Sequence, residues 1–261
     1  STPQRVLALV MLVMVVLASS GIYWFVHSQT SRPTKNSLQV KRSTPDVRAT
    51  QSVHATATAV ANTILVDPLS QNIHNWPVAM TGYKLYIFKD GAYHITDNDA
   101  QQSAPAILGG VILKGPMAYT LTIDEIQGDD SSINNSFGMI LRLNSQTSGN
   151  NNIVTFYCFE VVNTKGGQYQ FWKYDNSKGP TVNPWKSVWQ QSFGKEFRQG
   201  KGPKNSNTLK VFANGDTFTF TVNGKVVGSA HDKSLSSGEV GMLVNLKGTE
   251  VAFSNLMLTY S

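Results

Sequence analysis

The sequence has very little of the residues that usually identify catalytic or metal-binding chemistry. Its single cysteine, Cys158, excludes a disulfide within the chain and lies in an apolar run, where we expect a small buried side chain. The five histidines are scattered, without the close spacing of a zinc site. Neither a glycine-rich phosphate loop before a helix nor a G-x-S-x-G motif is present. The sequence therefore predicts no cofactor.

Charged residues are also scarce, at 15% against 41% hydrophobic residues. The net charge of +6 is unevenly placed: residues 1–60 hold six basic residues and one acidic residue, which leaves +1 for all the rest. The main part of the chain is thus nearly neutral, which argues against a nucleic-acid partner. Its many Thr, Ser, Asn and Gly residues favour a β-rich, extracytoplasmic protein.

There is one long hydrophobic run, Val6–Val26, and it contains no charged residue. As a helix it would cover about 30 Å, the thickness of a bilayer core. Tyr23 and Trp24 lie near one end, where aromatic residues meet the membrane interface. A cleaved signal peptide ending near Ala18 is the alternative, but the apolar run continues past that point. We expect residues 1–27 to form a transmembrane helix that contacts the lipid bilayer through residues 6–26.

Two features of the sequence predict opposite membrane orientations for this span. More Lys and Arg follow the run than precede it, which by the positive-inside rule would place the C-terminal side in the cytoplasm. The composition of the remainder favours the outside, and we predict a single-pass protein of the cell membrane with its C-terminal domain extracytoplasmic. Residues 28–64, rich in Thr, Ser and Ala and broken by Pro33 and Pro45, predict a flexible linker. Because the chain starts with Ser1, we expect further residues before it in the whole protein.

Residues 65–261 carry the alternating patterns of an all-β domain. In "DTFTFTV" the residues Phe218, Phe220 and Val222 alternate with threonines, which predicts a half-buried strand. Asn223-Gly224 follows, and Asp90-Gly91 divides "YKLYIFKDGAYHI" in the same way, so both pairs predict two-residue hairpin turns. Strands at this spacing, without a long amphipathic helix, predict an antiparallel two-sheet jelly-roll sandwich.

The order of these motifs resembles a known superfamily. "DPLSQNIHNWPV", "FGMILRL", "YCFEVVNTKGGQYQFWK", "GEVGMLV" and "VAFSNLMLTY" follow one another as in concanavalin A-like jelly rolls. They are most similar to laminin-G-like, glycoside-hydrolase-family-16-like and 3-keto-disaccharide hydrolase-type domains on bacterial single-pass membrane proteins. The resemblance implies one concave and one convex sheet. It leaves the function open, because this fold serves lectins, hydrolases and adhesion modules.

The paired carboxylates of a retaining glycosidase, in an E-x-D-x-x-E arrangement, are absent from the sequence. Asp124 and Glu125 are neighbours and would point to opposite faces of a strand. Asp129 and Asp130 fall in the next turn, where we expect a solvated loop, with a structural calcium ion as the alternative.

One face of the predicted strands has the residue types of a sugar site. If Phe137, Phe159 and their alternates form the core, the opposite face carries a mixed polar and aromatic set: Arg142, Glu160, Gln170, Trp172 and Tyr174. An Arg142–Glu160 ion pair and a loop-covered Trp172 are the structural alternative. Trp185 and Trp189 would share a face on a helical turn and form either core or the rim of a ligand groove.

These patterns support three functions. The first is a membrane-anchored module that binds a glycan or another cell-surface ligand without catalysis. The second is a glycoside hydrolase in which Glu160 is the catalytic carboxylate, kept ionised by Arg142. The third is a passive interaction or spacer domain, such as the external part of a membrane kinase or sensor.

Overall fold

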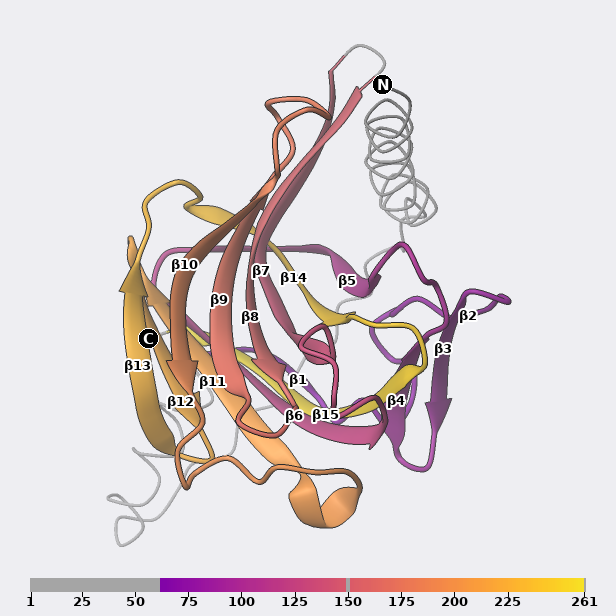
Figure 1. Ribbon diagram of the computed structural model, residues 1–261. Helices are drawn as coiled ribbons and strands as arrows, with labels where there is room; N and C mark the ends of the chain where they lie inside the picture. The colour runs from indigo at the N-terminus through magenta and orange to yellow at the C-terminus, as the bar shows by residue number, and fades with distance from the viewer. Residues whose placement is uncertain (1–61, 149–150, 261) are drawn as a thin grey trace, which may run out of the picture.

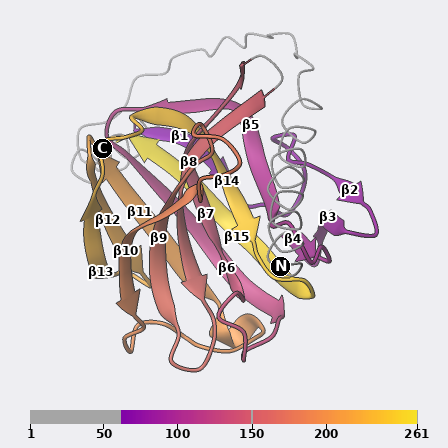
Figure 2. The same ribbon diagram turned by 45° about the horizontal axis from the view of Figure 1, so that its top comes forward.

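A computed structural model describes residues 62–148 and 151–260 as an all-β protein of two packed antiparallel sheets (Figures 1 and 2). This confirms the predicted two-sheet sandwich. Within the described ranges, no helix combines the length and the hydropathy that crossing a membrane requires. The predicted span Val6–Val26 and nearly all of the predicted linker lie outside the described residues.

The larger sheet has nine strands. Its order is β13 (Lys225–His231), β12 (Thr217–Val222), β11 (Asn207–Asn214), β6 (Met117–Gln127), β15 (Thr249–Tyr260), β4 (Ala92–Asp97), β3 (Lys84–Lys89) and β2 (Ala79–Met80), with β1 (Thr63–Asp67) paired to β15. The short strand β2 ends the sheet at one side of the molecule (Figure 1).

The smaller sheet has six strands, and it carries the candidate site. Its order is β10 (Trp185–Ser192), β9 (Gln168–Asp175), β8 (Asn151–Val162), β7 (Ser136–Ser148), β14 (Ser237–Val244) and β5 (Ala104–Lys114). Strands β7 to β10 run side by side across one layer (Figure 1). The only helical element in the described part of the chain is a 3-10 turn at Pro203–Asn205.

Both predicted hairpin turns are present. Asp90 and Gly91 have φ angles of 53° and 77°, and Asn223 and Gly224 have φ angles of 50° and 81°. Positive φ at both central residues is the requirement of a type I′ turn, which Asn, Asp and Gly meet at least cost. These turns join β3 to β4 and β12 to β13.

The core between the sheets is rich in stacked aromatic rings. Phe159 on β8 stacks on Phe220 of the opposite sheet with ring centroids 4.6 Å apart, and Phe171 packs against Phe218 at 4.8 Å. Among the described residues, the strands of both sheets and the core side chains extend from residue 63 to residue 260. We expect residues 62–261 to fold as an independent unit.

The "DPL…W" segment at the start of the domain has a structural role. The buried Asp67 carboxylate accepts hydrogen bonds from the Leu69 amide at 2.8 Å and from Nε1 of Trp76 at 2.9 Å, and it pairs with Nδ1 of His74 at 2.9 Å. One carboxylate thus holds the first loop against the core.

Candidate functional site

The candidate site lies on the outer face of the six-stranded sheet, defined as the face that points away from the nine-stranded sheet. A second apolar cluster covers part of this face, separate from the main core. It consists of Ile107, Ile140, Leu143, Val154, Phe156, Cys158, Tyr174 and Leu243. Cys158 is fully buried here, as its apolar surroundings predicted.

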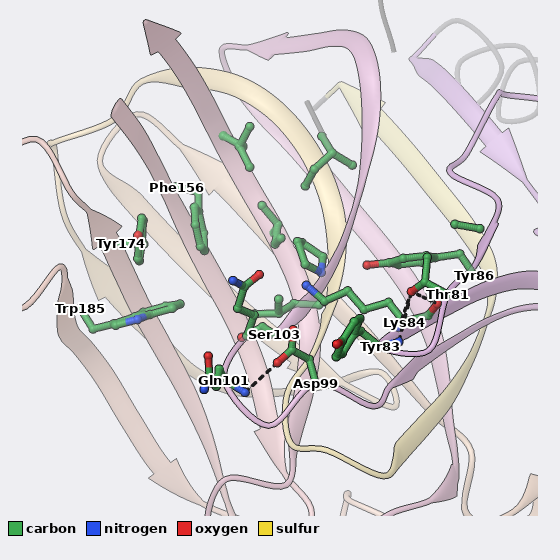
Figure 3. Close-up of a pocket in the computed structure, with 17 residues that line it drawn as sticks. Thr81, Tyr83, Lys84, Tyr86, Asp99, Gln101, Ser103, Phe156, Tyr174 and Trp185 are labelled. Atoms are coloured by element: carbon green, nitrogen blue, oxygen red, sulfur yellow. Dashed lines mark hydrogen bonds between the residues drawn. The ribbon is translucent and has the colours of Figure 1, made fainter. Parts of the chain in front are cut away.

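A pocket of about 390 Å³ opens over this cluster (Figure 3). All six strands contribute to it: Ile107 from β5, Leu243 from β14, Ile140 and Leu143 from β7, Phe156 from β8, Tyr174 from β9 and Trp185 from β10. The other side is formed by the β2–β3 segment, with Tyr83, Lys84 and Tyr86, and by the loop between β4 and β5, with Asp99, Gln101 and Ser103. Segments far apart in the chain therefore enclose one cavity.

Aromatic rings continue from the pocket across the outer face. Tyr174 stacks on Phe156 at 4.9 Å and meets the edge of Trp185 at 4.9 Å, and Trp185 also meets Trp172 at 6.4 Å. Trp172 donates a hydrogen bond from Nε1 to Oε1 of Gln170 at 2.8 Å. We call the set Gln170, Trp172, Tyr174 and Trp185 the aromatic strip. Its members share the outer face, as predicted for the first three of them.

Lys84 is the positively charged residue of the pocket lining, and nearby carboxylates offset only part of the cost of burying its charge. Its ammonium makes no hydrogen bond or ion pair with another described residue, while Asp97 and Asp99 attract it from a distance. Burial is the main cause that lowers the pKa of Lys84, and the two carboxylates oppose it. Asp97 is 1% exposed, its Oδ2 atom is buried without a partner in the described structure, and burial raises its pKa to about 7. Asp99 accepts a hydrogen bond at its Oδ1 atom from the backbone N–H of Gln101 at 2.8 Å (Figure 3).

Glu160 lies on the outer face beyond the strip, and its environment differs from the predicted one. Its Oε2 atom accepts hydrogen bonds from Ser136 Oγ at 3.1 Å and from Asn245 Nδ2 at 3.0 Å. Burial raises its pKa to about 7, and the two hydrogen bonds oppose that rise. The expectation that a neighbouring Arg142 keeps Glu160 ionised is therefore wrong.

Arg142 is absent from the outer face because of a β-bulge in β7. The register between β7 and β8 shifts between Leu141 and Asn144, and Arg142 has a φ of 52°. The extra residue reverses the alternation, so Leu143 joins the outer cluster instead of the core. The Arg142 guanidinium lies over the Phe218 ring at 4.8 Å and donates from Nη1 to the Leu235 carbonyl at 2.6 Å. The predicted placement of Arg142 beside Glu160, including their ion pair, is wrong for this reason.

Trp185 and Trp189 lie on a strand rather than on a helical turn. The register of β10 against β9 shifts between Ser187 and Trp189, so the two indoles point to opposite faces. Trp189 stacks on Phe220 at 4.7 Å between the sheets, whereas Trp185 is 36% exposed at the pocket. Trp189 is thus partly buried and packs against the core, whereas Trp185 is a rim residue, so each of the two predicted alternatives applies to one of them.

Sequence reasoning missed the part of the site that β5 and the β2–β3 segment supply. Pro105 and the Gly109-Gly110 pair interrupt the alternation in "APAILGGVILK", so this segment was not expected to be a strand. The alternation of Ala104, Ala106 and Leu108 with Ile107 was the available signal. Lys84 carried no signal at all, because a lysine at the start of a strand is normally solvent-exposed.

Among the acidic residues near the end of β6, Glu125, Asp129 and Asp130 have protein partners, whereas the Oδ1 atom of Asp124 is buried without a hydrogen-bond partner in the described structure. Asp124 and Glu125 point to opposite sides, as predicted: Glu125 is buried and bonded to the Asn135 and Asn163 amides. Asp129 accepts from Ser131, and Asp130 pairs with Lys201 at 2.7 Å. Across residues 62–148 and 151–260, no three His, Cys, Asp or Glu side chains are grouped to hold a metal ion.

Comparisons with known proteins relate this chain to others by fold. No protein-family model matches the sequence. No curated protein matches it either. Among solved structures, a carbohydrate-binding module, CBM66 from Bacillus subtilis, is similar with a TM-score of 0.51 at 16% identity over 72% of this chain and 97% of that one.

Two further solved structures show the same relationship. A protein of unknown function with a galectin-like fold from Bacillus subtilis has a TM-score of 0.55 at 10% identity, covering 76% of this chain and 96% of that one. The carbohydrate recognition domain of Emp47p has a TM-score of 0.52 at 13% identity, covering 77% and 98%. At these identities the likeness is one of fold. The described residues form an antiparallel two-sheet sandwich with the fold of these proteins, in agreement with the predicted fold class.

Proposed function

We propose that this protein is a carbohydrate-binding module that holds its ligand on the outer face of the six-stranded sheet without turning it over. The observation that carries the proposal is the aromatic strip, in which Trp172 and Trp185 lie beside the Gln170 amide. Aromatic rings pack against the apolar faces of sugar rings, and amide groups bond to their hydroxyls. The fold supports the proposal, since it is shared with a carbohydrate-binding module and a carbohydrate recognition domain.

A glycan array probed with residues 62–261 tests this function. We expect binding to at least one glycan, and we expect Trp185→Ala and Trp172→Ala each to lower the affinity for that glycan tenfold or more. Trp189→Phe is the matched control, because that indole packs on Phe220 between the sheets. Binding that survives both substitutions, or no binding to any glycan, would refute the proposal and favour the passive interaction domain.

Glycoside hydrolysis is the second candidate, and the raised pKa of Glu160 favours it, because a carboxyl with a pKa of about 7 suits a general acid. The cross-strand neighbours of Glu160 supply no second carboxylate. Glu160 has Gly138 and Leu243 beside it on one side, and Gln170 and Gln190 on the other. A glycosidase needs a second carboxylate about 5–9 Å away, and none of these four neighbours provides it. Release of reducing sugar from an oligosaccharide and 3-keto-glycoside panel that vanishes in Glu160→Gln would establish hydrolysis instead.

We also propose that the module faces the outside of the cell, anchored by residues 6–26. The uncharged run Val6–Val26 and the nearly neutral domain support this arrangement. Ser229 is exposed on β13, and the lone Cys158 is buried. A Ser229→Cys variant of the full chain should therefore react with a membrane-impermeant maleimide on intact cells, while the unchanged protein does not. Labelling only after lysis would place the domain inside.

A further inference from the structure

The pocket is too large and too apolar to be only a site for sugar hydroxyls. Its volume of about 390 Å³ lies over Ile107, Ile140, Leu143 and Leu243, all at most 5% exposed. An apolar cavity of about 150 Å³ already binds benzene and excludes water. Hydroxyl groups placed over this floor would lose hydrogen bonds to water and gain none. The floor therefore selects a hydrocarbon group larger than a single small ring.

The pocket and the aromatic strip form one continuous surface. Trp185 and Tyr174 both line the pocket and are in contact (Figure 3). Trp185 also meets Trp172, which is not among the lining residues. Polarity rises along this path, from the aliphatic floor, past the indoles, to Gln170 and then Glu160 with its partners Ser136 and Asn245. A ligand that spans the whole surface needs a polar end and an apolar end.

Polar groups also line the mouth of the pocket. The Lys84 ammonium has no hydrogen-bond partner among the described residues, and Gln101 and Ser103 lie nearby (Figure 3). Two carboxylates interact electrostatically with Lys84: Asp97, its buried cross-strand partner on β4, and Asp99, which lines the pocket. The pocket lining therefore carries charges of both signs. Such a mouth suits a neutral, hydrogen-bonding head rather than a strongly charged one.

We propose that the pocket receives an alkyl or acyl substituent of a sugar, whose ring lies on the aromatic strip. The ligand class is therefore an alkylated or acylated glycoside, with the hydrocarbon over Ile107, Ile140 and Leu243 and the ring against Trp185 and Trp172. This inference rests on the proposed carbohydrate-binding function and narrows its ligand.

The test measures how affinity depends on chain length. Residues 62–261 are titrated with methyl, butyl, hexyl and octyl β-D-glucosides below their micellar concentrations, and with 1-hexanol. Each methylene that enters the pocket should raise affinity about three- to fourfold, as burial of a methylene group requires. The gain should level off once the pocket is full.

A filling variant shows whether the pocket is responsible. Ser103 is partly exposed at the pocket, so Ser103→Phe places a ring in the cavity and leaves the aliphatic floor intact. Ser229→Phe is the matched control, since Ser229 lies on β13 at the edge of the other sheet. Ser103→Phe should abolish the dependence on chain length, with an unchanged circular dichroism spectrum and melting temperature, and Ser229→Phe should preserve it.

The possible outcomes distinguish a failure of this inference from a failure of the proposed carbohydrate-binding function. Glycan binding without any gain from chain length, or with the same gain in Ser103→Phe, overturns the inference and leaves carbohydrate binding intact. Equal affinity for 1-hexanol and hexyl glucoside, combined with an empty glycan array, would overturn both. A gain with chain length that only Ser103→Phe removes, together with tighter binding of hexyl glucoside than of 1-hexanol, supports both.

Discussion

The two faces of the six-stranded sheet are built from the same strands, yet they differ in how completely they are filled. The inner face presents Phe159, Phe171 and Tyr157 to the aromatic rings of the other sheet. The outer face presents Phe156 and Tyr174 to a pocket and Glu160 to a polar cluster. Packing against a second sheet stabilises the fold, whereas an unpaired face leaves room for a ligand.

The largest expected difference between the faces is in stability. Phe159→Ala should lower the free energy of unfolding by about 3–5 kcal/mol, because it leaves a closed cavity among stacked rings. Phe156→Ala should lower it by less than half as much, since that ring borders a space that is already open. Urea unfolding of residues 62–261 measures both, and equal losses would show that the outer face is packed as tightly as the core.

The pH dependence of stability tests the buried carboxyl of the outer face. The pKa of Glu160 is raised to about 7 in the fold, so its stabilising contribution is complete below its ordinary value of 4.5. That contribution is lost as pH rises to about 7. Its size is on the order of 3 kcal/mol, because each unit of difference between the folded and unfolded pKa corresponds to about 1.4 kcal/mol.

Glu160→Gln isolates this effect. Its amide oxygen can accept the same bonds from Ser136 and Asn245, so the variant imitates the protonated acid. Relative to Glu160→Gln, the unchanged protein should lose stability between pH 4.5 and 7. Asp97, with a pKa of about 7, titrates in both proteins and cancels in the comparison. Parallel stability curves for the two proteins would contradict the assignment.

Substitution of the two tryptophans of β10 should have different effects: one should lower mainly stability, and the other mainly glycan affinity. Trp189→Ala removes the stack on Phe220 and should lower the free energy of unfolding by about 2 kcal/mol. Trp185→Ala should change stability by less than about 1 kcal/mol and weaken glycan binding instead, because its ring is exposed at the pocket rim. Paired unfolding and binding measurements test this, and a reversed pattern would contradict the assignment of Trp189 to the inner face and of Trp185 to the pocket rim.

The smallest expected effect is that of Arg142. Arg142→Ala removes the contact over Phe218 and the bond to the Leu235 carbonyl, and should destabilise the fold by about 1–2 kcal/mol. Glycan affinity should remain within twofold, because Arg142 lies on the inner side of the sheet. A large loss of glycan affinity without a loss of stability would show that Arg142 contributes to ligand binding.

The sequence alone determined the fold class and its local chemistry. The alternation in Thr217–Val222 and the Asn223-Gly224 and Asp90-Gly91 turns specify antiparallel hairpins, because side-chain period and backbone conformation are local properties. The same alternation placed Glu160, Gln170, Trp172 and Tyr174 on one face correctly, since no bulge interrupts the pairing of β8 with β9.

Only the tertiary structure decided the composition of the site. The bulges at Arg142 and before Trp189 reverse the alternation in β7 and β10, and an inserted residue is visible only when two strands are paired. The pocket forms where β2, β3 and the β4–β5 loop meet the outer face, and these segments are distant in the chain. The raised pKa of Glu160 follows from burial, which depends on everything packed around it. Strand period is a property of neighbouring residues, whereas register, enclosure and desolvation are properties of the whole sandwich.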